Sequence, residues 1–262
     1  MSLPVSPAPC PASRQVTVSV VSHGQEALLR ELLADIVRHA SDTVCRIVLT
    51  HNLPTTDPAL LAERALHLHN PTPKGFGANH NAAFQHCDTE WFAVVNPDIR
   101  FDHDVFLALL AHASPGDGVL APALLDPRTG CIASNRGLLT PLEIVGRKVF
   151  GHKPPSRVVW LPGAFLLLRA ETFRQIGGFD ERFHLYAEDF DLCARLRLTG
   201  ADLRYVADVR VTHAAQFSSH VRWRYLRWHV TSLLRLWLTS SFWKYRALLR
   251  QEQHSVKQSA SS

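Results

Sequence analysis

The order of apolar segments in the first fifty residues most narrows the folds open to this chain. Residues 16–22 (VTVSVVS) are β-branched and apolar, which is typical of a buried strand. Residues 26–39 place leucine, isoleucine and valine at helical spacing, and residues 46–50 (RIVLT) are again apolar and β-rich. A strand, a helix and a strand in this order predict a right-handed βαβ unit and a parallel sheet. Ligands bind such sheets at the carboxyl ends of the strands, where Ser22 and Asn52 lie.

Length and composition allow one large domain with a hydrophobic core. The chain has 262 residues, of which 46% are hydrophobic, and a net charge of +5. This charge fits an anionic partner, such as a nucleoside diphosphate or an acidic membrane surface, without selecting one. No apolar run approaches the roughly 18 residues of a membrane span. The five cysteines are scattered and form no C-x-x-C pair, so we expect a reduced, cytosolic setting without disulfides or structural zinc.

Changes in composition suggest four parts. Residues 1–14 are rich in proline, alanine and serine without the apolar core of a signal peptide, which predicts a disordered leader. Residues 15–215 carry the alternating apolar segments of an α/β domain. Residues 216–251 form a basic and aromatic helical extension, and residues 252–262 are expected to form a polar, disordered tail.

The most unusual stretch is GGFDERFHLYAEDFDLCAR at residues 177–195. Its glycine pair suits a turn with positive φ, and its second half has a helical pattern. The acids would lie at the helix N-terminus, where the helix dipole favours negative charge. The simplest role for Asp191 is an ion pair with Arg195 one turn later. Glu188 and Asp189 instead suit the mouth of a pocket, where a carboxylate can act as a general base.

Two further segments end in polar residues. Residues 74–81 (KGFGANHN) predict a close-approach loop that leads into a helix, and the pattern alone fits an ordinary loop as well as a nucleotide-contacting turn. Residues 91–98 (WFAVVNPD) predict a buried strand that stops at Pro97 and projects Asp98 from its carboxyl end. Asp98 alone fits a turn, or the cap of a helix near residues 103–112, as well as a ligand site.

The stretch at residues 177–195 resembles the acceptor-side motif of the family-two glycosyltransferases, G-G-F-D-E-x-F-x-x-Y-x-E-D-x-D-L-x-x-R. The G-F-G-x-x-x-N segment matches the family pattern that lies against the nucleotide, and a G-A pair precedes the G-G-F-D-E turn. N-P-D stands in the place of the family's D-x-D motif, as in a branch that resembles rhamnosyltransferases. The resemblance covers about residues 16–213. It implies a GT-A fold, in which a mostly parallel central sheet is flanked by helices in a single α/β domain, here with a C-terminal helical extension.

The resemblance also implies an inverting, metal-dependent transfer of a sugar from a nucleoside-diphosphate donor. Asp189 would take the proton from the acceptor hydroxyl, and Glu188 would orient the acceptor or tune Asp189. Asp98 and His213 would hold Mg²⁺ or Mn²⁺. The residues expected to contact the nucleotide sugar are Ser22, Asn52, Gly75, Phe76, Gly77, Asn81, Asn96, Asp98, Gly163 and Ala164.

Two departures from the family pattern keep a non-catalytic, sugar-nucleotide-binding module as an alternative. Residues 51–54 (HNLP) replace the D-N-x-S segment of the family, and N-P-D keeps one carboxylate. A nucleotidyltransferase is a further alternative. It would need a glycine-rich loop with lysine or arginine after the first strand, whereas residues 22–26 (SHGQE) contain neither.

Residues 217–250 contain no acid and interleave arginine and lysine with tryptophan, tyrosine and phenylalanine. This pattern fits a helix packed on the domain, a nucleic-acid site or a helix docked on a membrane. We favour the membrane surface and expect no nucleic acid, partly because similar enzymes act on lipid-linked acceptors. By resemblance, the expected donor is dTDP-rhamnose, followed by UDP sugars, and the expected acceptor is a glycan or lipid-linked hydroxyl in surface polysaccharide synthesis. The expected location is cytoplasmic, peripheral on the inner face of the cell membrane.

Overall fold

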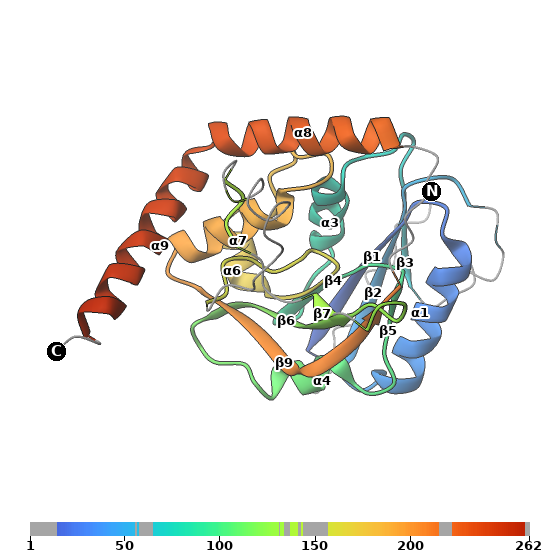
Figure 1. Ribbon diagram of the computed structural model, residues 1–262. Coiled ribbons are helices and arrows are strands. Elements are labelled where there is room, and N and C mark those ends of the chain that lie inside the picture. Colours follow the sequence, from blue (N-terminus) through green and yellow to red (C-terminus); the bar gives the residue numbers. More distant parts are fainter. Residues whose placement is uncertain are drawn as a thin grey trace.

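A nine-stranded sheet runs through the middle of the molecule, with helices on both of its faces (Figure 1). One half is parallel, in the order β3-β2-β1-β4: β1 (Val16–Ser22), β2 (Val44–His51), β3 (Leu66–His69) and β4 (Trp91–Val95). Helix α1 (Glu26–His39) connects β1 to β2, which confirms the predicted βαβ unit. The computed structural model describes residues 15–55, 57, 65–130, 132–133, 137–140, 143, 157–214 and 222–259. The predicted leader at residues 1–14 lies outside these ranges.

The other half of the sheet mixes directions. Strand β8 (Phe165–Arg169) is antiparallel to β4 and to β6 (Asp117–Leu125), and β6 runs parallel to β9 (Asp202–His213). The short strands β5 (Ile99–Arg100) and β7 (Ile132–Ala133) pair with β9 and β6. The helices are α3 (Phe76–Phe84), α4 (Val105–Leu110), α6 (Ala170–Gln175), α7 (Glu188–Leu198), α8 (Arg222–Leu238) and α9 (Ser240–Ser259).

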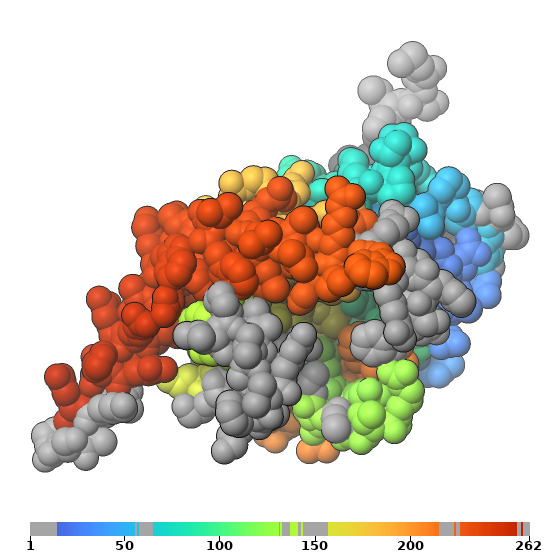
Figure 2. Space-filling model, turned by 45° about the horizontal axis from the view of Figure 1, so that its top comes forward, coloured from blue at the N-terminus to red at the C-terminus, as the bar shows by residue number. Residues whose placement is uncertain are grey.

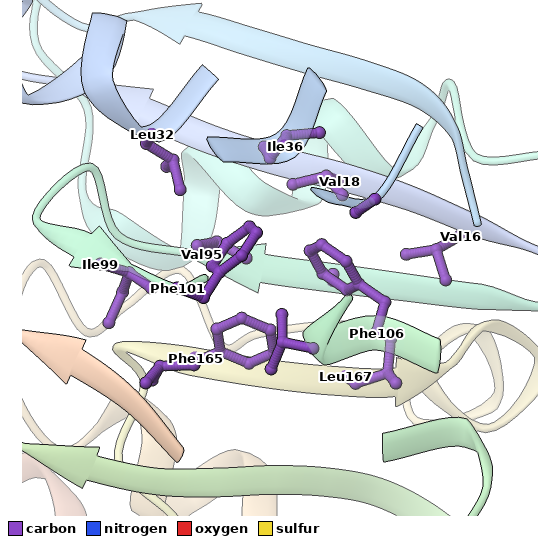
Figure 3. Close-up of a cluster of buried hydrophobic side chains, with 14 of the residues drawn as sticks. Val16, Val18, Leu32, Ile36, Val95, Ile99, Phe101, Phe106, Phe165 and Leu167 are labelled. Atoms are coloured by element: carbon purple, nitrogen blue, oxygen red, sulfur yellow. The ribbon is translucent and has the colours of Figure 1, made fainter. Parts of the chain in front are cut away.

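The central strands are buried on both faces, which explains why β4 is apolar at every position. On one face, Val95 and Phe165 belong to a core with Leu32 of α1 and Phe106 of α4 (Figure 3). Alternate residues of the same strands, such as Phe92, join a second core with α3, α6, α7 and α9. The two cores hold three layers together and fix the carboxyl ends of β1, β2 and β4 side by side.

The C-terminal helices pack on the domain. Phe242 and Tyr245 of α9 are fully buried, and both rings contact Phe190 of α7. The Tyr245 hydroxyl also donates a hydrogen bond to the Val159 carbonyl, at 2.6 Å. Among the described helices, none combines the length and the hydropathy that a membrane span requires.

Two expectations need correction. The disordered tail was expected to begin at residue 252, but α9 continues to Ser259, and Glu252 in this last part of the helix forms ion pairs with Arg197 and Arg157, at 2.6 and 3.3 Å. Cys45 is disulfide-bonded, so the expectation of a chain without disulfides is wrong. The positions of cysteines along a sequence do not report their separation in space, which decides whether they can pair.

Candidate active site

The E-D pair of carboxylates opens α7 after a turn with unusual backbone geometry. Tyr186 and Ala187 both have positive φ angles, of 71° and 66°. Residues other than glycine rarely adopt this region, and each such residue costs about 1–3 kcal/mol unless the surroundings hold it in place. Ala187 also precedes the helix without offering a side-chain cap. The turn therefore fixes where Glu188 and Asp189 emerge, at the expense of local stability.

Two elements hold this turn. The Phe76 N–H, at the start of α3, donates a hydrogen bond to the His184 carbonyl at 2.9 Å. The Ser232 hydroxyl, on α8, donates to the Leu185 carbonyl at 2.8 Å. In Figure 1, α8 passes along the top of the molecule above α3 and α7. The strained turn is thus tied to segments that lie more than a hundred residues apart in the chain.

Backbone groups orient the Asp189 carboxylate. Its Oδ2 accepts a hydrogen bond from the Gly163 N–H at 3.1 Å, and its Oδ1 accepts one from the Phe190 N–H at 2.8 Å. These donors and the N-terminal end of α7 stabilise the charged form of the carboxylate. A carboxylate that oriented donors hold in its charged form can act as a general base.

Gly163 lies between the Asp189 side chain and the ring of Phe76. A Cβ atom at this position would lie 3.5 Å from both the Asp189 Cβ and the Phe76 ring, so the glycine lies between them. The next residue, Ala164, accepts a hydrogen bond from the Asn96 N–H at 2.9 Å. The structure thus brings five of the predicted site residues into one neighbourhood.

Glu188 differs from Asp189 in its surroundings. It is buried, and its Oε2 has no hydrogen-bond partner among the described residues. Burial, followed by repulsion from Asp189, raises the pKa of Glu188 to about 8. At neutral pH Glu188 therefore favours its protonated form. Of the two roles expected for Glu188, its burial favours tuning Asp189 over contacting an acceptor.

We expect Glu188→Gln to flatten the pH dependence of stability. A carboxyl group whose pKa rises on folding stabilises the fold below its unfolded pKa, and this contribution disappears as the pH rises from 4.5 to about 8. Glutamine matches the shape of the protonated acid but cannot ionise. Thermal unfolding at pH 6 and pH 8.5 tests this: the fall in Tm should be larger for the wild type than for the variant. Equal decreases in Tm for the two proteins would contradict the raised pKa of Glu188.

The G-F-G segment at residues 75–77 packs against the stretch at residues 177–195 that contains Glu188 and Asp189. A Cβ on Gly75 would lie 2.8 Å from the His184 carbonyl oxygen, and one on Gly77 would lie 2.6 Å from the Phe179 Cβ. Neither position admits a side chain without a shift of its neighbours. Contact between two protein segments therefore explains both glycines, which were expected to contact the nucleotide.

The Asn81 side chain forms hydrogen bonds to a segment that is distant in the chain. Its Nδ2 donates to the Phe179 carbonyl at 2.9 Å, and its Oδ1 accepts from the Phe179 N–H at 2.9 Å. The same Nδ2 lies 3.0 Å from the Glu181 carboxylate. These bonds hold the amide against the G-G-F-D-E turn, and the expected nucleotide contact of Asn81 stays a prediction. Asn81 is a clamp between α3 and this turn.

We expect Asn81→Ala to lower the free energy of unfolding by about 1–3 kcal/mol, because it leaves the Phe179 backbone groups without their partner. Urea denaturation would measure the loss. Gln85→Ala, at an exposed position that follows the same helix, is the matched control and should change the free energy by less than about 0.5 kcal/mol. Equal losses in the two variants would show that Asn81 is no clamp.

A cavity of about 440 Å³ opens at the carboxyl ends of β1, β2 and β4. Its volume is within the range of small-molecule sites. Residues from each strand end, from the G-F-G segment, from the strained turn and from α8 contribute to it; they include Val21, Asn52, Phe76, Asp98, His184 and Trp228. The parallel-sheet rule thus located the cavity correctly.

Ser22 and Asn52 shape the cavity mainly through hydrogen bonds. Ser22 is buried and its carbonyl accepts from the Asn52 N–H at 2.8 Å, while its neighbours Val21 and His23 line the cavity. The Asn52 Oδ1 accepts from the Lys74 N–H at 2.8 Å. Asn52 therefore lines the cavity and fixes the loop before α3, whereas the expected ligand contact of Ser22 is not supported by its position.

Asp98 and His213 come together although 115 residues separate them in the chain. Asp98 follows β4, and β5 pairs with the end of β9, which carries His213. The Asp98 Oδ1 lies 3.4 Å from the His213 Nε2. The cap of α4 is Asp104, which accepts from the Leu107 N–H at 2.9 Å. The capping role that the sequence left open for Asp98 is thereby excluded.

The Asp98–His213 pair fits a divalent cation. The Asp98 Oδ1 is buried and accepts no hydrogen bond from the described residues. A carboxylate oxygen beside an imidazole nitrogen provides two suitable donor atoms. Among the described residues, no cluster of three or more histidine, cysteine, aspartate or glutamate side chains is placed to hold a metal. A cation at this pair would therefore need further ligands, such as phosphate oxygens or water.

Lys74, His184 and Trp228 are among the residues of the cavity wall that the sequence analysis did not assign to the site. Lys74 is the one lysine or arginine among the described residues that line the cavity. His184 and Trp228, whose rings lie 4.8 Å apart, form the side toward α8. Lys74 was detectable, because it directly precedes the G-F-G segment. Trp228 carried no signal of its own among the many aromatic residues of the C-terminal extension.

The amino-acid sequence is similar to those of known proteins. Residues 91–255 match the family described as Glycosyl transferase family group 2. Rhamnosyltransferase WbbL of Escherichia coli (strain K12) is 27% identical over 246 residues, which cover 84% of this chain and 91% of WbbL. N-acetylglucosaminyl-diphospho-decaprenol L-rhamnosyltransferase of Mycobacterium tuberculosis (strain ATCC 25618 / H37Rv) is 34% identical over 143 residues, or 47% of each chain. The match thus spans about half the length of this second relative.

Solved structures share the fold. Mannosyltransferase PcManGT from Pyrobaculum calidifontis, in complex with GDP-Man and Mn²⁺, matches this structure with a TM-score of 0.59 at 20% sequence identity. The match covers 84% of this chain and 63% of the PcManGT chain. Glucosyl-3-phosphoglycerate synthase from Mycobacterium tuberculosis, in complex with Mn²⁺ and UDP, matches with a TM-score of 0.59 at 15% sequence identity. This match covers 86% of this chain and 80% of the synthase chain. These likenesses confirm the GT-A fold. Because the family match covers more than half of the chain, this protein belongs to Glycosyl transferase family group 2 and is a glycosyltransferase.

Proposed function

We propose that this glycosyltransferase moves rhamnose from dTDP-rhamnose to a hydroxyl group, with inversion at the anomeric carbon. The observation that carries the proposal is the position of Gly163, which joins the oriented Asp189 carboxylate to the Phe76 wall of the cavity. The choice of rhamnose is supported by two relatives that are named as rhamnosyltransferases. UDP sugars are the next candidates for the donor.

The cavity offers separate places for the parts of the donor. Its wall combines apolar surface from Phe76 and Val21 with the positive charge of Lys74. We assign the diphosphate to the part of the wall that carries Asn96 and Asp98, where the Asn96 amide can donate to phosphate oxygens, and Lys74 of the same wall would contribute positive charge. The sugar would then lie toward Gly163 and Asp189.

Asp98 and His213 would hold a divalent cation, Mg²⁺ or Mn²⁺. When bound, the cation would neutralise negative charge on the diphosphate. The orphaned Asp98 Oδ1 beside the His213 Nε2 supports this assignment. Two solved structures with the same fold contain Mn²⁺, which supports a divalent cation in general.

The chemistry assigned to the chain is proton removal. Asp189 accepts the proton of the acceptor hydroxyl, and the hydroxyl oxygen forms a bond to the anomeric carbon. The bond from that carbon to the diphosphate oxygen breaks, and the nucleoside diphosphate leaves with the electron pair. Attack opposite the leaving group inverts the configuration. Glu188, protonated at neutral pH, supplies no competing charge beside the base.

The acceptor is proposed to be a glycan or a lipid-linked oligosaccharide in surface polysaccharide synthesis. The name of one relative specifies a decaprenol-linked substrate, which supports a lipid carrier. We place the enzyme in the cytoplasm, peripherally on the inner face of the cell membrane. The basic C-terminal helices support this location, because an anionic membrane surface attracts them.

A donor panel tests the proposal. Purified protein is incubated with dTDP-rhamnose and several UDP sugars, with and without Mn²⁺ and a membrane lipid extract, and released nucleoside diphosphate is measured. Metal-dependent release from one donor, lost in Asp189→Asn, would support the proposal and identify the donor. Binding of a donor without turnover, even with the lipid extract, would favour the non-catalytic module. Pyrophosphate release from a nucleoside triphosphate would favour a nucleotidyltransferase, and binding of no nucleotide sugar would overturn the proposal.

A further inference from the structure

Helix α8 has two faces with different surroundings. On its inner face Ser232, Leu233 and Leu236 are buried against the domain. On its outer face five apolar side chains are exposed at intervals of three or four residues, so they form one stripe along the helix. This outer stripe consists of Trp223, Leu226, Val230, Leu234 and Leu238. Figure 2 shows α8 as a ridge along the surface of the molecule.

The outer stripe is unusually exposed for its composition. Trp223 is 83% exposed and Leu238 is 87% exposed. Single exposed apolar residues are common on proteins, but a continuous row of them indicates a binding surface. The structure contains no described segment that covers this row.

The charges around the outer stripe indicate what covers it. Arg227 and Arg235 are exposed on the same helix, and Lys244 and Arg250 are exposed on α9. No aspartate or glutamate occurs between residues 217 and 250. A second copy of this helix would bring like charges together, which disfavours a symmetric dimer. An apolar row beside cations without acids matches the interface of an anionic lipid bilayer.

We propose that the outer stripe docks α8 into the headgroup layer of an anionic lipid bilayer. This inference deepens the proposed function, since a lipid-linked acceptor would reach the enzyme from that surface. The same helix contributes Trp228 to the cavity wall and holds the strained turn through Ser232. The ring of His229 on α8 also packs edge-on against Tyr186, at 5.0 Å. Docking would therefore place the lipid surface on the outer side of the same helix whose inner side contributes to the cavity wall.

Vesicle binding tests this surface. Wild-type protein is sedimented with vesicles of phosphatidylcholine alone or mixed with phosphatidylglycerol. The double variant Val230→Ser and Leu234→Ser removes the centre of the outer stripe. The matched control, Val37→Ser and Leu107→Ser, removes two residues of similar exposure from α1 and α4, which pack on the other face of the sheet.

We expect the wild type to bind the mixed vesicles in preference to neutral ones. The stripe variant should bind them at least about tenfold more weakly, because two inserted apolar side chains are lost. The control variant should bind like the wild type. Equal binding by the two double variants, or no vesicle binding by the wild type, would overturn the proposal. So would a wild-type dimer in light scattering that the stripe variant converts to monomer, since the occupant would then be a second copy.

A second measurement separates this inference from the proposed function. Release of nucleoside diphosphate is followed without vesicles, with water as the acceptor, and the stripe variant should match the wild type. If no donor is turned over even with the membrane lipid extract, while vesicle binding shows the expected pattern, the proposed function fails and the docking surface stands. If the donor is turned over while the stripe variant still binds vesicles fully, the docking surface fails alone.

Discussion

Replacing Asp189 with asparagine is expected to lower the rate of sugar transfer by about 10³-fold, the usual contribution of a positioned general base. The structure gives the carboxylate two backbone donors, from Gly163 and Phe190, and a place at the start of α7. Asparagine keeps the size of the side chain but cannot take a proton from a hydroxyl group. The acceptor oxygen would therefore attack without assistance.

The loss of rate can be separated from a loss of stability. The asparagine amide would direct its NH₂ group at one of the two N–H donors, so one hydrogen bond would be lost. We expect this to cost about 1–2 kcal/mol of unfolding free energy, which leaves the protein folded. Donor affinity should change little, because the expected defect lies in proton removal. Rate, donor affinity and unfolding should therefore be measured on the same preparation.

Asp180→Asn is the matched control for this variant. Asp180 belongs to the same stretch and pairs with Arg182 at 2.5 Å, where the arginine side chain is exposed and the aspartate is largely buried. Neither residue lines the cavity, so the loss of this pair should leave the rate within about twofold of the wild type. A similar decrease in both variants, or an Asp189→Asn enzyme within about tenfold of the wild-type rate, would refute the role of Asp189 as the base.

The sequence predicted those elements whose signal is local. Strand β1 and helix α1 begin and end where the apolar patterns do. The ion pair between Asp191 and Arg195 was also predicted correctly, at 2.7 Å, because one helical turn fixes their separation. Strand order is different, because it depends on pairs such as Ala93 with Leu167. Local pattern gives no information about such distant partners.

The same limit applies at the site. The hydrogen bonds of Asn81 could not be predicted, because its partner Phe179 lies 98 residues later in the chain. Trp228 reaches the cavity only because α8 folds back over the strained turn. The motifs located Asp98 and Asp189 because the resemblance supplied their roles. The resemblance gave no information about hydrogen bonds within the protein. Such hydrogen bonds decide which side chains remain available to a ligand.

Exchanging Asp98 for asparagine is expected to lower Mn²⁺-stimulated turnover by about 10²-fold or more, because the neutral amide is a weaker ligand than the carboxylate. The His213→Gln variant should show a smaller loss, since the carboxylate remains. Binding of Mn²⁺, measured by calorimetry, gives a readout that does not depend on activity. Both variants should bind Mn²⁺ more weakly than the wild type.

Because few side chains of the described residues are available to bind Mn²⁺ at this site, the prediction extends to the effect of an added nucleoside diphosphate on Mn²⁺ binding. Because Asp98 and His213 would supply only two donor atoms, wild-type affinity for Mn²⁺ should increase when dTDP or UDP is added, since phosphate oxygens would complete the set. Asp98→Asn should lose most of that increase. Asp102→Asn is the matched control, because Asp102 and His103 form a second aspartate–histidine pair, at 2.9 Å, that is exposed. An increase that persists in Asp98→Asn would show that the cation is held elsewhere, and the diphosphate would then have to be placed away from the end of β4.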